Sequence, residues 1–214
     1  MSELPPDRPS TAPLTFDVTY PDRDLNRLTS ALRMFTIIPI AIVLGVIGGS
    51  STSWQHADER YTVAISGTGL LVLPPLLMLL FRGKYPRWWF EFNRELLRFT
   101  ARVGAYAALL TDRYPATDEQ QDVHLELPEP TAQLNRGLPL IKWLLAIPHY
   151  IVLAFLYLGV LVAVVIAWFA ILFTGRYPRG LYDYVVGVGR WHLRVVAYAF
   201  ALVTDEYPPF RLAP

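Results

Sequence analysis

LPLIKWLLAIPHYIVLAFLYLGVLVAVVIAWFAILF, residues 138–173, is an almost unbroken apolar run that Lys142 and His149 interrupt. An α-helix rises about 1.5 Å per residue, so about 20 apolar residues cross a hydrocarbon core that is about 30 Å thick. The run is therefore long for one membrane crossing and short for two.

Two arrangements of this run remain open. In a single crossing, the basic residues before and after the run would face opposite compartments, which the positive-inside tendency disfavours. We therefore expect a hairpin with a tight turn at residues 157–160. The competing arrangement is one long, strongly tilted helix with an interfacial lead-in up to Pro148.

Composition supports a membrane protein. Hydrophobic residues make up 53% of the 214 positions and charged residues 17%, and the mean hydropathy is +0.32. These values disfavour a freely soluble domain. A net charge of +1 provides no general attraction for nucleic acid, and the absence of cysteine excludes disulfides, thiolate catalysis and cysteine-ligated zinc.

The first half of the chain contains further apolar runs. Residues 1–13 are rich in proline and predict a disordered tail. Residues 32–49 and 61–81 are each long enough to span a membrane, and the polar residues 50–60 between them predict a short exposed loop. Residues 88–110 interleave apolar and charged side chains at helical spacing, which predicts a helix lying in the membrane interface.

The second half repeats motifs of the first. GKYPR at 83–87 recurs as GRYPR at 175–179, LNR at 25–27 recurs at 134–136, and Thr-Asp-x-Tyr-Pro at 111–115 recurs at 204–208. Matches in the same order indicate a duplication. We expect one repeat at 14–116, an acidic linker at 117–130, and a second repeat at 131–214 whose interfacial helix covers about 181–203.

Two short segments, 16–20 and 123–127, alternate apolar and polar residues, so we expect brief strands that pair on the cytoplasmic side. The predicted fold is thus an all-α membrane protein with two tandem repeats, each a transmembrane hairpin plus an amphipathic interfacial helix. Both termini are expected in the cytoplasm.

Four phrases resemble an actinobacterial membrane-protein family catalogued as domain of unknown function 4389. They are KWLLAIPH at 142–149, FTGRYPRG at 173–180, RW at 190–191 and TDEYPPF at 204–210. The resemblance is strong over 123–210 and weaker over 16–115, where Ile40 replaces the histidine of His149 and Ala116 the proline of Pro209. It implies a multi-pass protein of the bacterial plasma membrane and carries no assigned chemistry.

Catalytic and metal-binding signatures are weak. The four histidines lack the i, i+4 spacing of a helical metal site, and His149 is interpreted as an interfacial group bonded to the backbone rather than as a pH-responsive one. Asp112 and Asp205 recur, yet each lies in a phrase typical of a helix end followed by a turn. We therefore expect no enzyme, metal or cofactor.

The strongest functional pattern is a charged stripe that occurs in both repeats. Its members are Glu91, Arg98, Arg102 and Tyr106 in the first repeat and Asp183, Arg190, Arg194 and Tyr198 in the second. Guanidinium groups bind phosphate oxygens well, so the arginines beside Tyr85 and Tyr177 predict docking of anionic lipid or of a membrane protein complex. Alternatively, the arginines extend to water and pair with acidic residues nearby.

Tryptophans near these stripes are expected to anchor the protein at the membrane surface, namely Trp88, Trp89, Trp143 and Trp191. Partners are expected to be anionic lipid, a membrane protein or a second copy of the chain, and not nucleic acid. A subunit of an export or permeation pathway is the alternative function.

Overall fold

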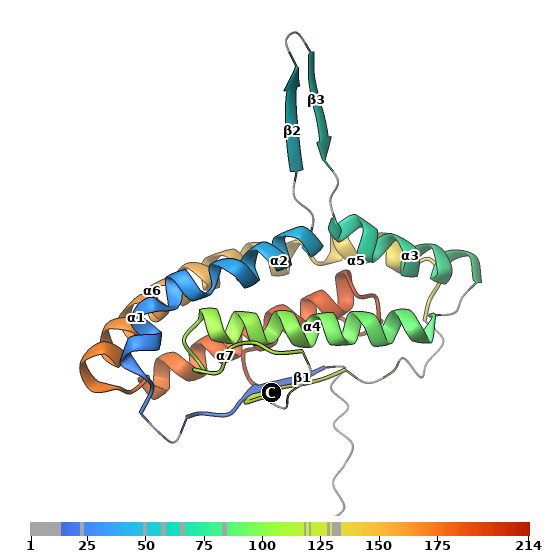
Figure 1. Cartoon of the computed structure of the whole chain (residues 1–214). Coiled ribbons are helices and arrows are strands. Elements are labelled where there is room, and N and C mark those ends of the chain that lie inside the picture. Colours follow the sequence, from blue (N-terminus) through green and yellow to red (C-terminus); the bar gives the residue numbers. More distant parts are fainter. Residues whose placement is uncertain are drawn as a thin grey trace, which may run out of the picture.

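The computed structural model describes residues 14–21, 24–48, 51–56, 59–64, 67–82, 85–117, 119, 121–127, 129 and 134–214. Helices dominate these ranges and form two layers, with a small sheet beneath them (Figure 1). The tail expected at residues 1–13 lies outside the described residues.

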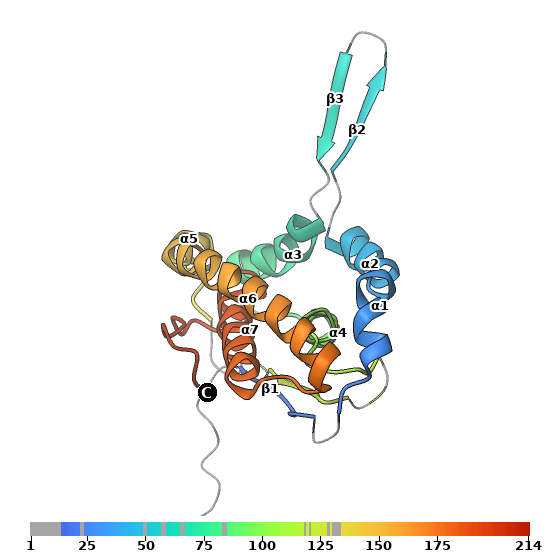
Figure 2. The ribbon, with the colours of Figure 1, turned by 90° about the vertical axis from the view of Figure 1, so that its left-hand side faces the viewer.

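The first layer, called the outer layer below, consists of α1 (Arg27–Thr36), α2 (Ile38–Gly48), α3 (Gly67–Arg82), α5 (Pro139–Leu145) and α6 (Ile147–Thr174). Helix α1 packs against α6, and α3 packs against α5, so the two halves of the chain run in opposite directions across this layer (Figure 2).

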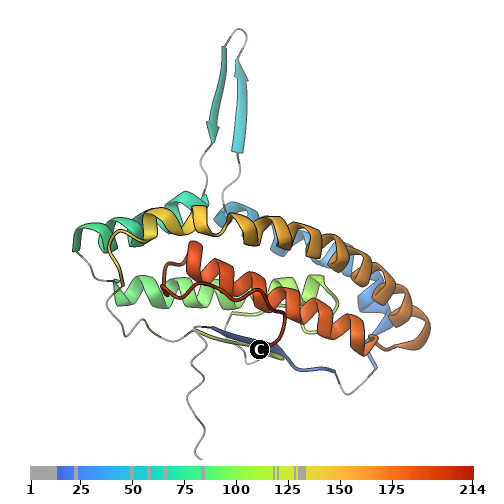
Figure 3. The same ribbon diagram turned by 180° about the vertical axis from the view of Figure 1, so that it is seen from behind.

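The second layer consists of α4 (Arg87–Ala107) and α7 (Arg179–Ala199). These helices correspond to the ones expected at 88–110 and 181–203. Strand β1 (Thr15–Val18) pairs antiparallel with β4 (Val123–Glu126), as expected from their alternating pattern, and Phe16 lies opposite Leu125. The sheet lies on the side of α4 and α7 away from the outer layer (Figure 3).

The hairpin expected within residues 138–173 is wrong, because α6 continues without a turn through residues 157–160. A lone glycine among Leu, Ala and Val residues does not by itself form a turn, so the helix continues through this segment. The chain breaks instead at Ala146, since Pro148 is suited to the first turn of a new helix. The uninterrupted helix of the competing arrangement is observed, and it is preceded by the separate short helix α5.

The helix expected at 61–81 starts further along the chain than the sequence predicted. Residues 50–60 were expected to be a loop, but β2 (Ser51–His56) and β3 (Glu59–Ala64) form an antiparallel pair that projects from the outer layer (Figure 1). The aromatic and β-branched residues in this segment favour strands, a preference that its polarity obscured. Helix α3 therefore starts at Gly67 and has 16 residues.

The core lies between the sheet and the helices, while the outer layer exposes apolar side chains. Phe16 and Leu125 from the sheet pack with Ala101 of α4 and Val185 of α7 in one cluster. Two helical segments, Arg27–Gly45 and Ile147–Thr174, are long and apolar enough to cross a membrane, and only 17% of each is buried. Neither segment is enclosed in the core, although one face of α6 contributes Ala163, Ala167 and Ile171 to it.

Candidate functional site

Two buried cations occupy equivalent places in the two halves. Arg33 of α1 lies 2.6 Å from Asp112 and also donates to the backbone carbonyls of Thr111 and Tyr106. Lys142 of α5 is fully buried. Each cation also lies near a tyrosine ring, Arg33 over Tyr106 and Lys142 over Tyr198.

Lys142 repeats the pattern of Arg33. Its Nζ lies 2.7 Å from Asp205 Oδ1 and donates to the Thr204 carbonyl at the same distance. The second oxygen of Asp205 accepts the backbone N–H of Asn135, as Asp112 accepts that of Asn26. Each aspartate thereby ties the start of an outer-layer segment to the end of α4 or α7, which is a structural role.

The sequence contained a signal for these ion pairs. Arg33 and Lys142 occupy matching positions of the repeated motifs, as do Asp112 and Asp205. A basic residue and an aspartate that recur together in an apolar context indicate a buried pair, because an isolated buried charge is strongly disfavoured.

Arg98 and Arg190 bind the two strands. Arg98 of α4 donates from Nε to the carbonyl of Leu125, and Arg190 of α7 donates from Nε to the carbonyl of Phe16, at 3.0 and 2.8 Å. Because Phe16 and Leu125 are directly opposed, each arginine holds the strand that belongs to the other half of the chain.

Arg102 and Arg194 bind the segments that follow α4 and α7. Arg102 donates to the carbonyl of Ala116 at 2.6 Å, and Arg194 donates to that of Ala213 at 2.7 Å. All four arginines therefore donate to backbone carbonyls. The alternative in which they pair with acidic neighbours holds in part, since Arg98 and Arg190 also form ion pairs.

Tyr85 and Tyr177 point inward rather than toward a ligand. The Tyr85 hydroxyl donates to the Ala201 carbonyl at 2.8 Å, and burial raises its pKa to about 12. Tyr177 is buried, its carbonyl accepts a hydrogen bond from Tyr20, and burial raises the pKa of its phenol. Both rings thus pack against the core cluster.

The four tryptophans that were expected to anchor the protein fall into two groups. Trp88 and Trp143 are exposed, and Trp89 is half-buried, which leaves all three with ring surface for lipid contact. Trp191 departs from the expected anchoring role because it is 5% exposed. Trp191 lies on the face of α7 that packs into a buried cluster.

Trp191 belongs to an aromatic cluster around His149. The Trp191 Nε1 donates to His149 Nδ1 at 3.0 Å, and Phe210 stacks on the imidazole with ring centroids 4.0 Å apart. Tyr207 completes the cluster. His149 is therefore buried among aromatic rings and bonded to a side chain, not to the backbone as expected, and the cluster attaches the C-terminal segment to α6 and α7.

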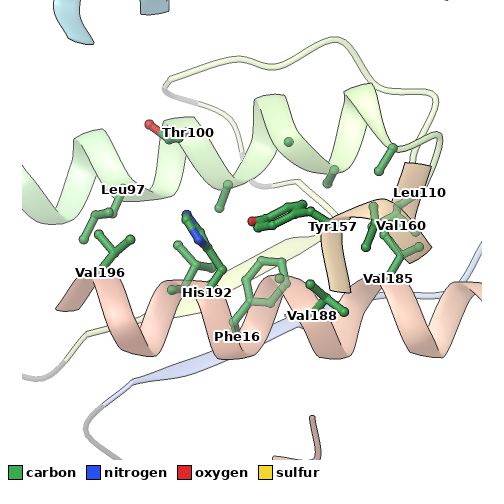
Figure 4. A pocket seen from close by; sticks show the side chains of 16 residues that line it. Phe16, Leu97, Thr100, Leu110, Tyr157, Val160, Val185, Val188, His192 and Val196 are labelled. Carbon is green, nitrogen blue, oxygen red and sulfur yellow. The ribbon is translucent and has the colours of Figure 1, made fainter. Parts of the chain in front are cut away.

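An apolar cavity of about 340 Å³ lies between α4 and α7 (Figure 4). Val160 of α6 and Phe16 of β1 contribute to its wall, and its polar side chains include Tyr157 and His192. No sequence pattern predicted this cavity, because the residues of one helix do not show which small residues of another helix will face them.

The family comparison concerns the second half of the chain. Residues 139–211 match the family Domain of unknown function (DUF4389). No curated protein and no solved structure matches the chain. The DUF4389 segment includes α5, α6 and α7, and so contains both partners of the Lys142–Asp205 pair and the aromatic cluster around His149. The residues that hold this half together thus lie within the matched segment.

Proposed function

We propose that the chain is a non-catalytic, multi-pass protein of the bacterial plasma membrane, built from two tandem repeats. The observation that carries the proposal is the apolar exposure of the outer layer, where Met34, Phe155 and Phe173 are 79, 70 and 77% exposed. Burying one such side chain is worth about 1.5–3 kcal/mol, so leaving the whole layer in water is highly unfavourable. Lipid satisfies it.

Both termini are placed on one side of the membrane by this proposal. Arg190 binds the carbonyls of Phe16, near the N-terminal end, and Leu212, near the C-terminal end. Strand β4 pairs with β1 and therefore lies on this side too. The basic residues that flank the apolar segments favour the cytoplasm for it.

Cysteine labelling tests the embedding directly, because the chain has no cysteine of its own. Phe155→Cys in native membranes is expected to resist a water-soluble maleimide, although Phe155 is largely exposed on the protein surface. Glu206→Cys, at an exposed polar position, is the matched control and is expected to react. Equal labelling of the two variants would contradict the membrane assignment.

The docking role is assigned to an excess of positive charge near the C-terminus. Burial lowers the pKa of Arg194, and repulsion from the neighbouring Arg211 and Arg190 lowers it further. Within the described ranges, Asp17 is the carboxylate that pairs with any of the three, and it is 72% exposed. An anionic group would compensate the remaining charge.

The position of these arginines favours an acidic segment of a partner protein. They lie on the sheet side of α7, whereas the apolar outer layer lies on the other side. With that layer in lipid, the exposed Arg211 side chain faces water, while Arg190 and Arg194 are largely buried beside it. We therefore assign the site to an acidic protein segment rather than to a lipid headgroup.

Arg211→Glu tests the docking role because the Arg211 side chain is exposed and makes no hydrogen bond within the described part of the chain. Protein in phosphatidylcholine nanodiscs is titrated with a polyglutamate peptide. An exposed charge pair is worth up to about 1 kcal/mol, so the reversal is expected to weaken binding about fivefold or more. Ionic strength near 1 M is expected to abolish binding.

Arg27→Glu, an exposed arginine at the start of α1, is the matched control and is expected to bind as the wild type does. Unchanged binding by Arg211→Glu would refute the assignment to this cluster. Displacement of the peptide by phosphatidylglycerol in the nanodisc would instead identify a lipid headgroup as the ligand.

A further inference from the structure

A polar pocket of about 300 Å³ lies where the segment before α1 meets the segment that joins α6 to α7. The backbone N–H of Leu25 donates to the Gly175 carbonyl at 2.8 Å, which holds the two segments together at one end of the outer layer (Figure 1). The polar and charged side chains of the pocket wall are those of Tyr20, Asp24, Arg176, Tyr177 and Arg179.

Neighbouring groups orient both arginines of the pocket and leave hydrogen-bond donors free. Arg176 donates from Nε to Asp24 at 3.0 Å, and its terminal nitrogen atoms form no hydrogen bond within the described residues. The Arg179 guanidinium lies over the Tyr20 ring, with Cζ 3.9 Å from the ring centroid. This cation–π contact uses the face of the guanidinium and leaves the N–H groups at its edge available. Oriented donors of this kind bind phosphate oxygens well.

The Tyr20 ring that supports Arg179 is itself fixed. Its hydroxyl donates to the Tyr177 carbonyl at 2.6 Å, and its ring meets that of Tyr182 edge to face, with centroids 4.9 Å apart. Because the support is already ordered, positioning the Arg179 guanidinium costs less entropy when a ligand binds.

The matching arginine in the first half of the chain has a different environment. Arg87 corresponds to Arg179 in the repeated motif, and its Nε lies 3.2 Å from Glu91 and 3.4 Å from Glu129. Asp183 occupies the position that matches Glu91, yet it forms no ion pair with Arg179 in the described part of the chain. One repeat therefore neutralises this arginine with carboxylates, and the other directs it to a pocket.

The pocket has a net positive charge at the edge of the apolar surface. Among the described residues of its wall, two guanidinium groups face the single carboxylate of Asp24, so the side-chain charges sum to +1. Phe173, shortly before Arg176, and Leu28, shortly after Asp24, are 77 and 68% exposed. With the outer layer in lipid, these neighbours place the pocket at the depth of the lipid headgroups, where basic side chains meet phosphates.

We propose that this pocket binds the headgroup of an anionic phospholipid, with the phosphodiester between Arg176 and Arg179 and a headgroup hydroxyl donating to Asp24. Phosphatidylglycerol has both features, and its single negative charge compensates the charge of the pocket. The volume lies at the lower end of the range of about 300–1,000 Å³ for small-molecule sites, which suits a headgroup whose acyl chains stay in the bilayer. The lipid site rests on the proposed membrane embedding and is independent of the docking of an acidic segment.

Native mass spectrometry of the full-length protein tests the lipid site, with phosphatidylglycerol or phosphatidylcholine titrated into the detergent micelles. The protein is expected to retain one phosphatidylglycerol more tightly than phosphatidylcholine, because choline has no proton to donate to Asp24 and leaves the lipid without net charge. Equal retention of the two lipids would overturn the proposal. Displacement of the lipid by inorganic phosphate would also overturn it, since the ligand would then be a soluble phosphate.

Arg179→Gln is the decisive variant because it removes the charge at an exposed position. Hydrogen bonds to charged groups are stronger than neutral ones, so the dissociation constant for phosphatidylglycerol is expected to rise about fivefold or more. Arg87→Gln is the matched control, at the same position of the other repeat, and is expected to bind as the wild type does. An unchanged dissociation constant for Arg179→Gln would refute the site.

Labelling of Phe155→Cys, described above, separates a failure of the lipid site from a failure of the membrane assignment. A protected thiol together with unchanged binding by Arg179→Gln would overturn the lipid site alone. A thiol that reacts as fast as the one introduced by Glu206→Cys would overturn the embedding and the lipid site with it.

Discussion

Asp205→Ala is expected to lower the free energy of unfolding by about 3–5 kcal/mol, because Lys142 would keep a buried charge without its carboxylate. The same substitution removes the acceptor for the Asn135 backbone N–H. Denaturant unfolding in mixed micelles, followed by far-UV circular dichroism, measures the loss.

Two comparisons make this result specific. Asp17→Ala, which removes the exposed partner of Arg190, is expected to change the free energy by less than about 1 kcal/mol. Lys142→Met combined with Asp205→Leu should recover most of the stability, because no buried charge then remains. A loss below about 1 kcal/mol for Asp205→Ala would show that Lys142 finds another partner or reaches water.

Trp191→Ala is expected to have a similarly large effect, about 3–5 kcal/mol, because a buried indole leaves a large cavity. It also removes the hydrogen bond to His149 and the edge-to-face contact with Phe210. The C-terminal segment should then separate from α6 and α7, and limited proteolysis after residue 203 would detect that separation.

Trp191→Phe separates packing from hydrogen bonding. It keeps an aromatic ring but leaves His149 Nδ1 without a donor, which is expected to cost about 1–3 kcal/mol. Trp88→Ala, at a 67% exposed position, should stay within about 0.5 kcal/mol of the wild type. If Trp191→Ala were as mild as Trp88→Ala, the aromatic cluster would not hold the C-terminal segment.

Matching contacts in the two halves give the proposed duplication a physical meaning. Arg33 and Lys142 both bind an aspartate that follows a helix of the second layer, and Leu109 and Leu202 both adopt positive φ after those helices. Because Arg98 and Arg190 each bind the strand of the opposite half, neither half holds its own strand by this contact. The halves are thus expected to fold as one unit.

The sequence predicted those parts of the fold that depend on local periodicity and on repetition. The helices at 87–107 and 179–199 follow from apolar residues at helical spacing, and the pairing of 15–18 with 123–126 follows from alternation in equivalent positions. It failed at residues 157–160 and 50–60, because a lone glycine and a polar segment are each compatible with more than one backbone conformation.

The amino-acid sequence alone predicted the apolar outer helices, the paired strands and the repeated motifs. Each of these features depends on the spacing of residues that are close in the sequence or on its repetition. The partners of the polar residues depended on tertiary structure. Helical spacing groups Arg98 with Arg102 on one face, but only packing against the sheet directs Arg98 to the Leu125 carbonyl. Likewise, Arg33 meets Asp112 across 79 positions.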